Sequence, residues 1–142
     1  MGYESYNFKL KKMRNINPEC TKGIFLNMRY LSTGEDTLEK TSDCGYIEVM
    51  IFSDNISLRT AKANDKQIME EIFADIRVLN DIVPVCIYDY QLKQEITFEN
   101  FHLAIENFNL LRNEFYEFYP NARCPVRCNE VFSEMRRLEN KL

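Results

Sequence analysis

The hydrophobic residues of this chain change their spacing in the middle of the sequence. Between Tyr46 and Lys62 they alternate with polar residues, as in β-strands that bury one face. From Asn64 onward they recur every three or four positions, which is the spacing of an amphipathic helix. A β-hairpin followed directly by a helix predicts an α+β fold, because neither an all-helical nor an all-strand chain shows both periods.

The hairpin is predicted from its turn and from its pairing. Asp54 and Asn55 separate two alternating segments, and both residue types tolerate the left-handed backbone of a two-residue hairpin turn. A turn of this length brings mostly apolar residues together on one face. The predicted pairs on that face are Ser53 with Ile56, Ile51 with Leu58, and Val49 with Thr60.

Other strands are predicted on both sides of the hairpin. Alternation in Tyr6, Phe8 and Leu10 indicates a half-buried strand. After a loop with Pro18 and Gly23, the spacing of Ile24, Leu26, Met28 and Tyr30 indicates a second strand. The polar stretch 32–45 is expected to be a connection, and 83–90 (VPVCIYDY) to be a fifth strand with Pro84 at its start or at a sheet edge. Direct pairing of this strand with 56–62 would be parallel, because a helix separates the two.

Three helices complete the prediction. Asn64 or Asp65 can cap the first, whose apolar stripe is Ile68, Ile72, Ile76 and Leu79. Thr97 can cap a long helix over 98–119 that ends before Pro120. This helix has a second apolar stripe, Leu103 and Leu110, on which the last helix, 129–141, is expected to pack. We therefore predict one α+β domain over 1–142, with a mostly antiparallel sheet of four to five strands packed by one crossover helix and a C-terminal pair of helices.

Composition is typical of a globular protein, and we expect a cytoplasmic location from the absence of a signal sequence and from the cysteines. At 142 residues it is large enough for one core, and no apolar run reaches the roughly 20 residues that span a bilayer. We expect no secretory leader and no membrane contact. The five cysteines are an odd number at scattered positions, which favours reduced thiols over a disulfide framework. They are Cys20, Cys44, Cys86, Cys124 and Cys128.

No catalytic or cofactor motif is found. Cys124 and Cys128 lack the second close pair of ligands that a zinc site needs, so we interpret them as structural thiols. His102 is the single histidine, and the four glycines are too scattered to form a phosphate-binding loop. We therefore predict no enzyme activity, cofactor or metal. An enzyme or small-ligand binder that uses His102, Cys86 or strand-end carboxylates is the less favoured alternative.

Charge is unevenly distributed. Residues 64–117 contain eleven acidic and four basic side chains, a local charge of −7, which would repel nucleic acid and attract a basic partner. Residues 1–31 have a local charge of +4. We interpret their cluster, Lys9, Lys11, Lys12 and Arg14, as protection of an edge strand against aggregation.

The acidic centre and the tyrosines beside it predict a protein-binding surface, because a tyrosine buries a large area at low entropic cost. In this acidic α+β character the chain resembles the immunity proteins that bacteria pair with polymorphic or contact-dependent toxins. The resemblance implies inhibition of a basic toxin, often a nuclease, by occlusion. An adaptor, a regulatory subunit or a homodimer is an open alternative, and monomer and dimer are not distinguished. The candidate interface residues are Glu70, Glu71, Asp75, Tyr88, Asp89, Tyr90, Glu99, Glu106, Glu114, Tyr116 and Glu117.

Overall fold

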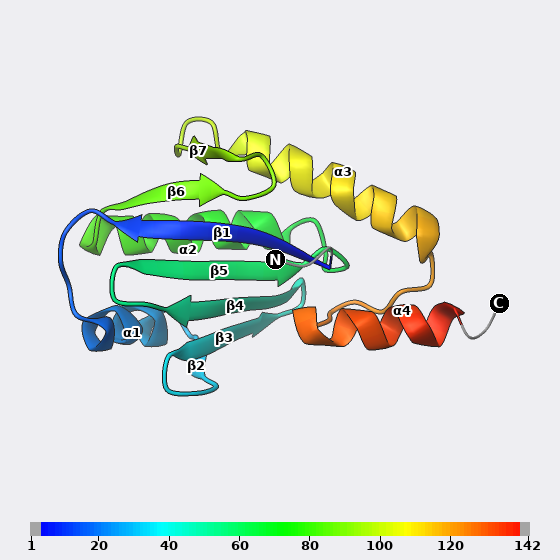
Figure 1. The fold of residues 1–142 in the computed structure, drawn as a ribbon, viewed down its shortest axis with the longest axis horizontal. Helices are drawn as coiled ribbons and strands as arrows, with labels where there is room; N and C mark the ends of the chain where they lie inside the picture. Colours follow the sequence, from blue (N-terminus) through cyan, green and yellow to red (C-terminus); the bar gives the residue numbers. More distant parts are fainter. Residues whose placement is uncertain (1–3, 140–142) are drawn as a thin grey trace.

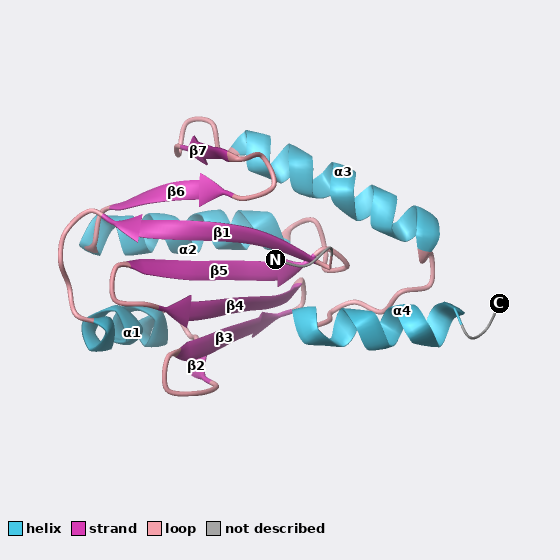
Figure 2. Cartoon of the chain, viewed as in Figure 1, coloured by secondary structure: helices cyan, strands magenta, loops and turns pink. Residues whose placement is uncertain are grey.

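The computed structural model describes residues 4–139. Within this range the strands form one antiparallel sheet of seven, in the order β2-β3-β4-β5-β1-β6-β7 (Figures 1 and 2). The strands are β1 Ser5–Lys12, β2 Leu31–Ser32, β3 Thr37–Ser42, β4 Gly45–Ile51, β5 Asn55–Ala61, β6 Val85–Asp89 and β7 Gln94–Ile96. The helices are α1 Pro18–Asn27, α2 Ile68–Ile82, α3 His102–Phe118, the 3-10 turn η1 Cys128–Glu130, and α4 Val131–Glu139.

The α+β class and the antiparallel sheet are confirmed, whereas the predicted number of strands is too small. The parallel direction predicted for β5 and β6 is correct, but the two strands do not pair directly. β1 lies between them and pairs antiparallel with both. The central order β4-β5-β1-β6, with α1 and α2 as the crossovers, is the βαββαβ connectivity of ferredoxin-like domains. Connectivity of this kind indicates a fold and leaves the function open.

The segment 24–30, predicted as a strand, is mostly helical. Pro18 occupies the first turn of α1, where its missing N–H costs nothing, and the Asn17 side chain accepts a hydrogen bond from the Cys20 backbone N–H at 3.0 Å. Thr21 and Phe25, one helical turn apart, face the core. These capping signals outweigh the alternation of Ile24 to Tyr30. The polar stretch 32–45 is not a mere connection either, since β2 ends and β3 lies within it.

The predicted hairpin is confirmed, but its turn is longer than expected. Ile51 pairs with Ile56 and Val49 pairs with Leu58, so four residues form the turn instead of two. The Phe52 backbone N–H donates to the Asn55 carbonyl at 2.9 Å and closes it. The register therefore shifts by two residues. Because side chains alternate with period two, every residue keeps its predicted face.

The core lies between the sheet and the helices on one of its faces. The inward side chains of β1 pack with the predicted α2 stripe, which is fully buried, and with Phe101 and Phe108 of the α3 segment. In Figure 1, α2 lies behind the sheet, and no helix of residues 4–139 covers the central strands on the near face. β1 and β6 are both interior strands. The edge position proposed for the lysine cluster is therefore wrong. Of the two positions proposed for Pro84, the start of the strand is correct, because Pro84 directly precedes β6.

The C-terminal helix does not pack where the sequence predicts. α4 and the segment before it form a second cluster with the end of β5, in which Val126, Cys128 and Val131 contact Ala61, Ala63 and Phe115. Leu110 of the expected docking stripe is 63% exposed. Polar contacts explain why α4 packs here instead of on α3. The Asn64 side chain, just after β5, donates to the Val126 carbonyl through its amide nitrogen and accepts from the Val126 N–H through its oxygen. The long helix also begins later than predicted, because Thr97 and Asn100 form a turn with each other.

Candidate functional site

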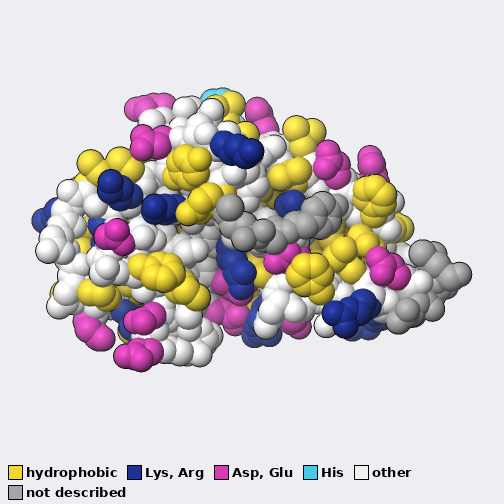
Figure 3. Space-filling model, in the orientation of Figure 1, with side chains coloured by type: hydrophobic (Ala, Val, Ile, Leu, Met, Phe, Trp, Pro, Cys, Tyr) yellow, Lys and Arg dark blue, Asp and Glu magenta, His cyan; other side chains and the backbone are white. Residues whose placement is uncertain are grey.

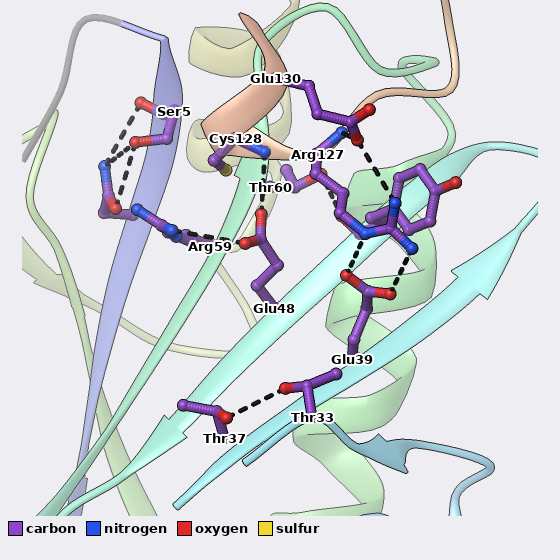
Figure 4. A network of polar contacts seen from close by, with 12 residues as sticks. Ser5, Thr33, Thr37, Glu39, Glu48, Arg59, Thr60, Arg127, Cys128 and Glu130 are labelled. Atoms are coloured by element: carbon purple, nitrogen blue, oxygen red, sulfur yellow. Dashed lines mark hydrogen bonds and ion pairs between the residues drawn. The ribbon is translucent and has the colours of Figure 1, made fainter.

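The uncovered face of the sheet contains a groove of about 570 Å³ over β3, β4, β5 and β1. Its charged walls are paired with each other (Figure 4). The Arg127 guanidinium donates to both carboxylate oxygens of Glu39, at 2.7 and 3.0 Å, and lies 4.3 Å from the centre of the Tyr46 ring. Glu48 accepts from Arg59 at 3.3 Å and from the Cys128 backbone N–H at 3.0 Å. These pairs fasten the C-terminal segment to the sheet, so we assign them a structural role.

Two predicted interface residues, Asp75 and Asp89, are buried. Asp75 accepts a hydrogen bond from the Tyr30 hydroxyl at 2.9 Å and forms a salt bridge with Lys40 at 3.0 Å. Asp89 accepts from the Tyr6 hydroxyl at 2.5 Å, and its other oxygen accepts two backbone N–H groups of the following turn. Each carboxylate is compensated by hydrogen bonds, as burial requires. Both therefore stabilise the fold and present no surface to a partner.

The contact between Tyr6 and Asp89 predicts a pH effect. Burial and the hydrogen bond to Asp89 raise the pKa of Tyr6 far above 10, its usual value. Tyr6 thus keeps its proton in the native state while the unfolded chain ionises. Its contribution to stability is complete below pH 10 and is lost as the pH rises above that value.

We expect Tyr6→Phe to be less stable at pH 7 by about 1–3 kcal/mol, because a buried carboxylate loses a donor. The same variant should lose stability less steeply between pH 10 and 12 than the parent, by up to about 1.4 kcal/mol per pH unit. Urea unfolding at several pH values measures both effects. Parallel pH profiles for the two proteins would contradict the assignment.

Tyr116 is also tied to the fold. Its hydroxyl donates to the Ala63 carbonyl at 2.5 Å, and its ring lies 4.7 Å from the Arg112 guanidinium carbon. Arg112 in turn donates to the Asn64 carbonyl at 2.7 Å. These contacts connect α3 to the loop after β5. Tyr116 is therefore better explained as a structural residue than as an anchor for a partner.

The exposed acidic candidates are concentrated on α3. Glu106, Glu114 and Glu117 lie on its solvent side together with two large hydrophobic residues, Leu110 and Phe118. Leu110 is 63% exposed and Phe118 is 73% exposed. At spacings of three and four residues these side chains form one stripe, which we call the α3 ridge. Figure 3 shows acidic and hydrophobic side chains next to each other along the rim that α3 forms.

The other candidates do not join this ridge. Glu70 lies in the first turn of α2 and Glu99 in the turn before α3, both exposed, whereas Glu71 accepts a hydrogen bond from the Ser42 hydroxyl at 2.8 Å. Tyr88 and Tyr90 lie on the uncovered face of the sheet, half-buried. The predicted interface is therefore divided between two surfaces and the interior. Phe118 was not among the predicted interface residues, although the four-residue spacing from Glu106 through Leu110 and Glu114 leads to it.

His102 and Cys86, the two residues considered for catalysis, form no hydrogen bond with each other in the described range: the Cys86 thiol, on β6, contacts the Met13 sulfur instead. His102 is exposed at the start of α3, and Cys128 is buried beside Glu48, where burial raises the pKa of its thiol. Burial also raises the pKa of Cys44 and of Cys124, so these thiols stay protonated at neutral pH. Among residues 4–139 no three His, Cys, Asp or Glu side chains are grouped as metal ligands.

Comparison with known proteins does not identify a relative. No family model, curated protein or solved structure matches this chain. None of the helices in the described range is both long enough and apolar enough to cross a bilayer.

Proposed function

We propose that this chain is a non-enzymatic protein-binding domain and that the α3 ridge contacts its partner. The observation that supports this proposal is the exposure of Leu110 and Phe118 on one side of a helix. Large hydrophobic side chains at such exposure, two turns apart on the same side of a helix, are typical of a surface that is covered in a complex. Such residues can act as anchors, because burying them releases water from a large apolar area.

The charges on the ridge favour a basic partner. Glu106 and Glu117 are exposed and form none of the salt bridges found among the described residues, so their charge faces solvent. Glu114 is also exposed, but it interacts with Lys62: burial lowers the pKa of Lys62, and the charge of Glu114 opposes that lowering. In a homodimer built on this ridge, these carboxylates would face their own copies, and like charges at an interface cost free energy. A basic protein surface would instead be attracted. Charge would then speed association, and the hydrophobic anchors would slow dissociation.

A basic toxin is the partner class that we favour, in keeping with the resemblance to immunity proteins. The domain would inhibit by covering the basic active site of the toxin, for instance that of a nuclease. This mechanism needs no catalytic group on the inhibitor. An adaptor or regulatory subunit would use the same ridge, but its partner would not be toxic.

The test uses the product of the neighbouring gene as the candidate partner. We expect it to co-purify with the full chain, and co-expression of the chain to restore growth of cells that produce it. Phe118→Ala should weaken binding at least about 10-fold, as expected for loss of a central aromatic anchor. Glu114→Lys should slow association and reduce its dependence on salt.

Two matched controls distinguish the ridge from a general effect of surface mutation. Phe52→Ala removes an aromatic ring that is 45% exposed in the β4–β5 turn, and Glu35→Lys reverses an exposed charge in the β2–β3 turn. Both should bind as the parent does. Equal affinity of the ridge variants and the controls would refute the ridge as the interface. A neighbouring gene product that neither binds nor harms cells would refute the toxin assignment.

A further inference from the structure

The lysines of β1 lie on the uncovered face of the sheet and need an explanation other than edge protection. β1 is paired on both sides, with β5 and with β6, so its backbone offers no free hydrogen bonds to another chain. Lys9 and Lys11 alternate with the buried Phe8 and Leu10, and their side chains therefore point away from the core. Neither ammonium group forms a salt bridge or a hydrogen bond with the part of the chain that the structure describes.

Two tyrosines stand beside these lysines. Lys9 is the register partner of Tyr88, and Lys11 is the register partner of Cys86. The rings of Tyr88 and Tyr90 meet edge to face, with their centres 5.3 Å apart. Figure 3 shows basic side chains next to hydrophobic ones, a class that includes Tyr and Cys, on this face over β1 and β6.

These residues line a hollow of about 220 Å³, which we call the tyrosine–lysine pocket. Its lining consists of Lys9, Lys11, Cys86, Tyr88, Tyr90 and Glu95. The hollow is smaller than the roughly 300–1,000 Å³ of most ligand pockets, so it suits one ring and its substituent. Within it, the two unpaired ammonium groups of Lys9 and Lys11 lie beside the side chains of Tyr88 and Tyr90. A ligand that satisfies both features has a flat ring and an attached anionic group.

We propose that the tyrosine–lysine pocket binds a nucleotide. The base would stack on a tyrosine ring, and the phosphate would lie against the ammonium groups of Lys9 and Lys11. Glu95, the register partner of Tyr88, supplies a hydrogen-bond acceptor that suits the exocyclic amine of adenine or cytosine. Stacking on aromatic side chains combined with basic contacts to the backbone is how many proteins bind single-stranded nucleic acid.

Most of the acidity that argued against nucleic acid lies elsewhere on the molecule. Glu95 is the one acidic side chain of residues 64–117 that lines the pocket, whereas the α3 ridge and the buried Asp75 and Asp89 lie outside it. Next to Lys9 the same face continues over Ser57 and Arg59 of β5 toward the larger groove. The nucleotide can therefore be a free molecule or one unit of a single strand that extends across the sheet.

Binding is measured on the full chain with a fluorescein-labelled eight-nucleotide oligoadenylate, by anisotropy at low salt. Unlabelled AMP and the unlabelled oligomer are the competitors. Competition by AMP identifies a free nucleotide as sufficient, and competition by the oligomer alone identifies the single strand; either result supports the pocket. A double-stranded competitor of the same length should be at least 10-fold weaker, because its bases cannot stack on the tyrosines.

Variants test the two parts of the pocket separately. Tyr88→Ala should weaken binding about 5- to 100-fold, whereas Tyr88→Phe, which keeps the ring, should bind as the parent does. Lys9→Gln should weaken binding and lower the slope of log affinity against log salt by about 0.7. Phe52→Ala and Lys66→Gln, which change exposed residues outside the pocket, are the matched controls.

Absence of binding at millimolar ligand, or unchanged binding by Tyr88→Ala, would overturn the proposal. Unchanged binding by Phe118→Ala would show that the pocket acts independently of the α3 ridge.

Discussion

Asn64→Ala is expected to lower the free energy of unfolding by about 3 kcal/mol. Asn64 lies just after β5 and is fully buried, and its side chain holds the C-terminal segment against the sheet by hydrogen bonds. Its amide nitrogen donates to the Val126 carbonyl at 2.9 Å and to the Thr60 hydroxyl at 3.1 Å, and its oxygen accepts from the Val126 N–H at 2.8 Å. Alanine leaves the N–H and carbonyl of Val126 without these partners, and each unsatisfied buried group costs about 1–3 kcal/mol, whereas the Thr60 hydroxyl still donates to the Tyr46 carbonyl at 2.8 Å.

The loss of stability in Asn64→Ala should extend beyond the hydrogen bonds of Asn64 itself. Val126, Cys128 and Val131 pack in the second cluster only if the segment before η1 lies against the end of β5. Urea unfolding of Asn64→Ala measures the loss. Asn113→Ala, which changes an exposed asparagine on α3, is the control and should stay within about 0.5 kcal/mol of the parent. A variant at position 64 that is as stable as the control would show that Val126 does not depend on this side chain.

Gly45→Ala is expected to destabilise the protein by a similar or larger amount, about 3–4 kcal/mol, for two independent reasons. Gly45, the first residue of β4, has φ of +143°, a conformation that residues with a Cβ rarely adopt. A Cβ at this position would also lie 2.3 Å from Cγ of Asn64. The added methyl group would therefore displace the side chain that holds Val126.

Gly23→Ala is the same substitution at another position, and here we expect it to stabilise the protein. Gly23 lies within α1, and a Cβ built there meets no heavy atom within 4 Å. Alanine should raise stability by about 0.5–1 kcal/mol, because it lowers the entropy of the unfolded chain and favours the helix. Thermal or urea unfolding of the two variants checks both signs. Destabilisation of equal size at both positions would indicate that backbone conformation and contact with Asn64 do not explain the result.

The predictions from sequence succeeded where the signal is local. Alternation in β1 and in the β4–β5 hairpin assigned each side chain to the correct face, even though the turn was two residues longer than expected. The stripe of α2 was correct for the same reason. The prediction for segment 24–30 failed because the alternation is short and the helix buries a different set of residues, Thr21 and Phe25, while Asn17 and Pro18 favour the start of a helix.

The candidate binding surfaces could be predicted only in part from the spacing of residues along the chain. Leu103 and Leu110 were recognised as a second apolar stripe, but the expected occupant, α4, packs at the end of β5 instead. The acids beside Leu110 could be listed from the sequence, whereas the burial of Asp75 and Asp89 could not. Those two carboxylates are buried because Tyr30, Lys40 and Tyr6, which are distant in sequence, supply their hydrogen bonds.

The sequence by itself determined which side chains of β1, β4, β5 and α2 face inward, since periods of 2 and 3.6 residues are properties of neighbouring positions. Only the tertiary structure decided that β1 lies between β5 and β6, and so that Lys9 stands beside Tyr88. It also decided that the α3 ridge stays uncovered. Contacts of this kind join residues far apart along the chain, and they depend on how all the elements pack together, which no local pattern encodes.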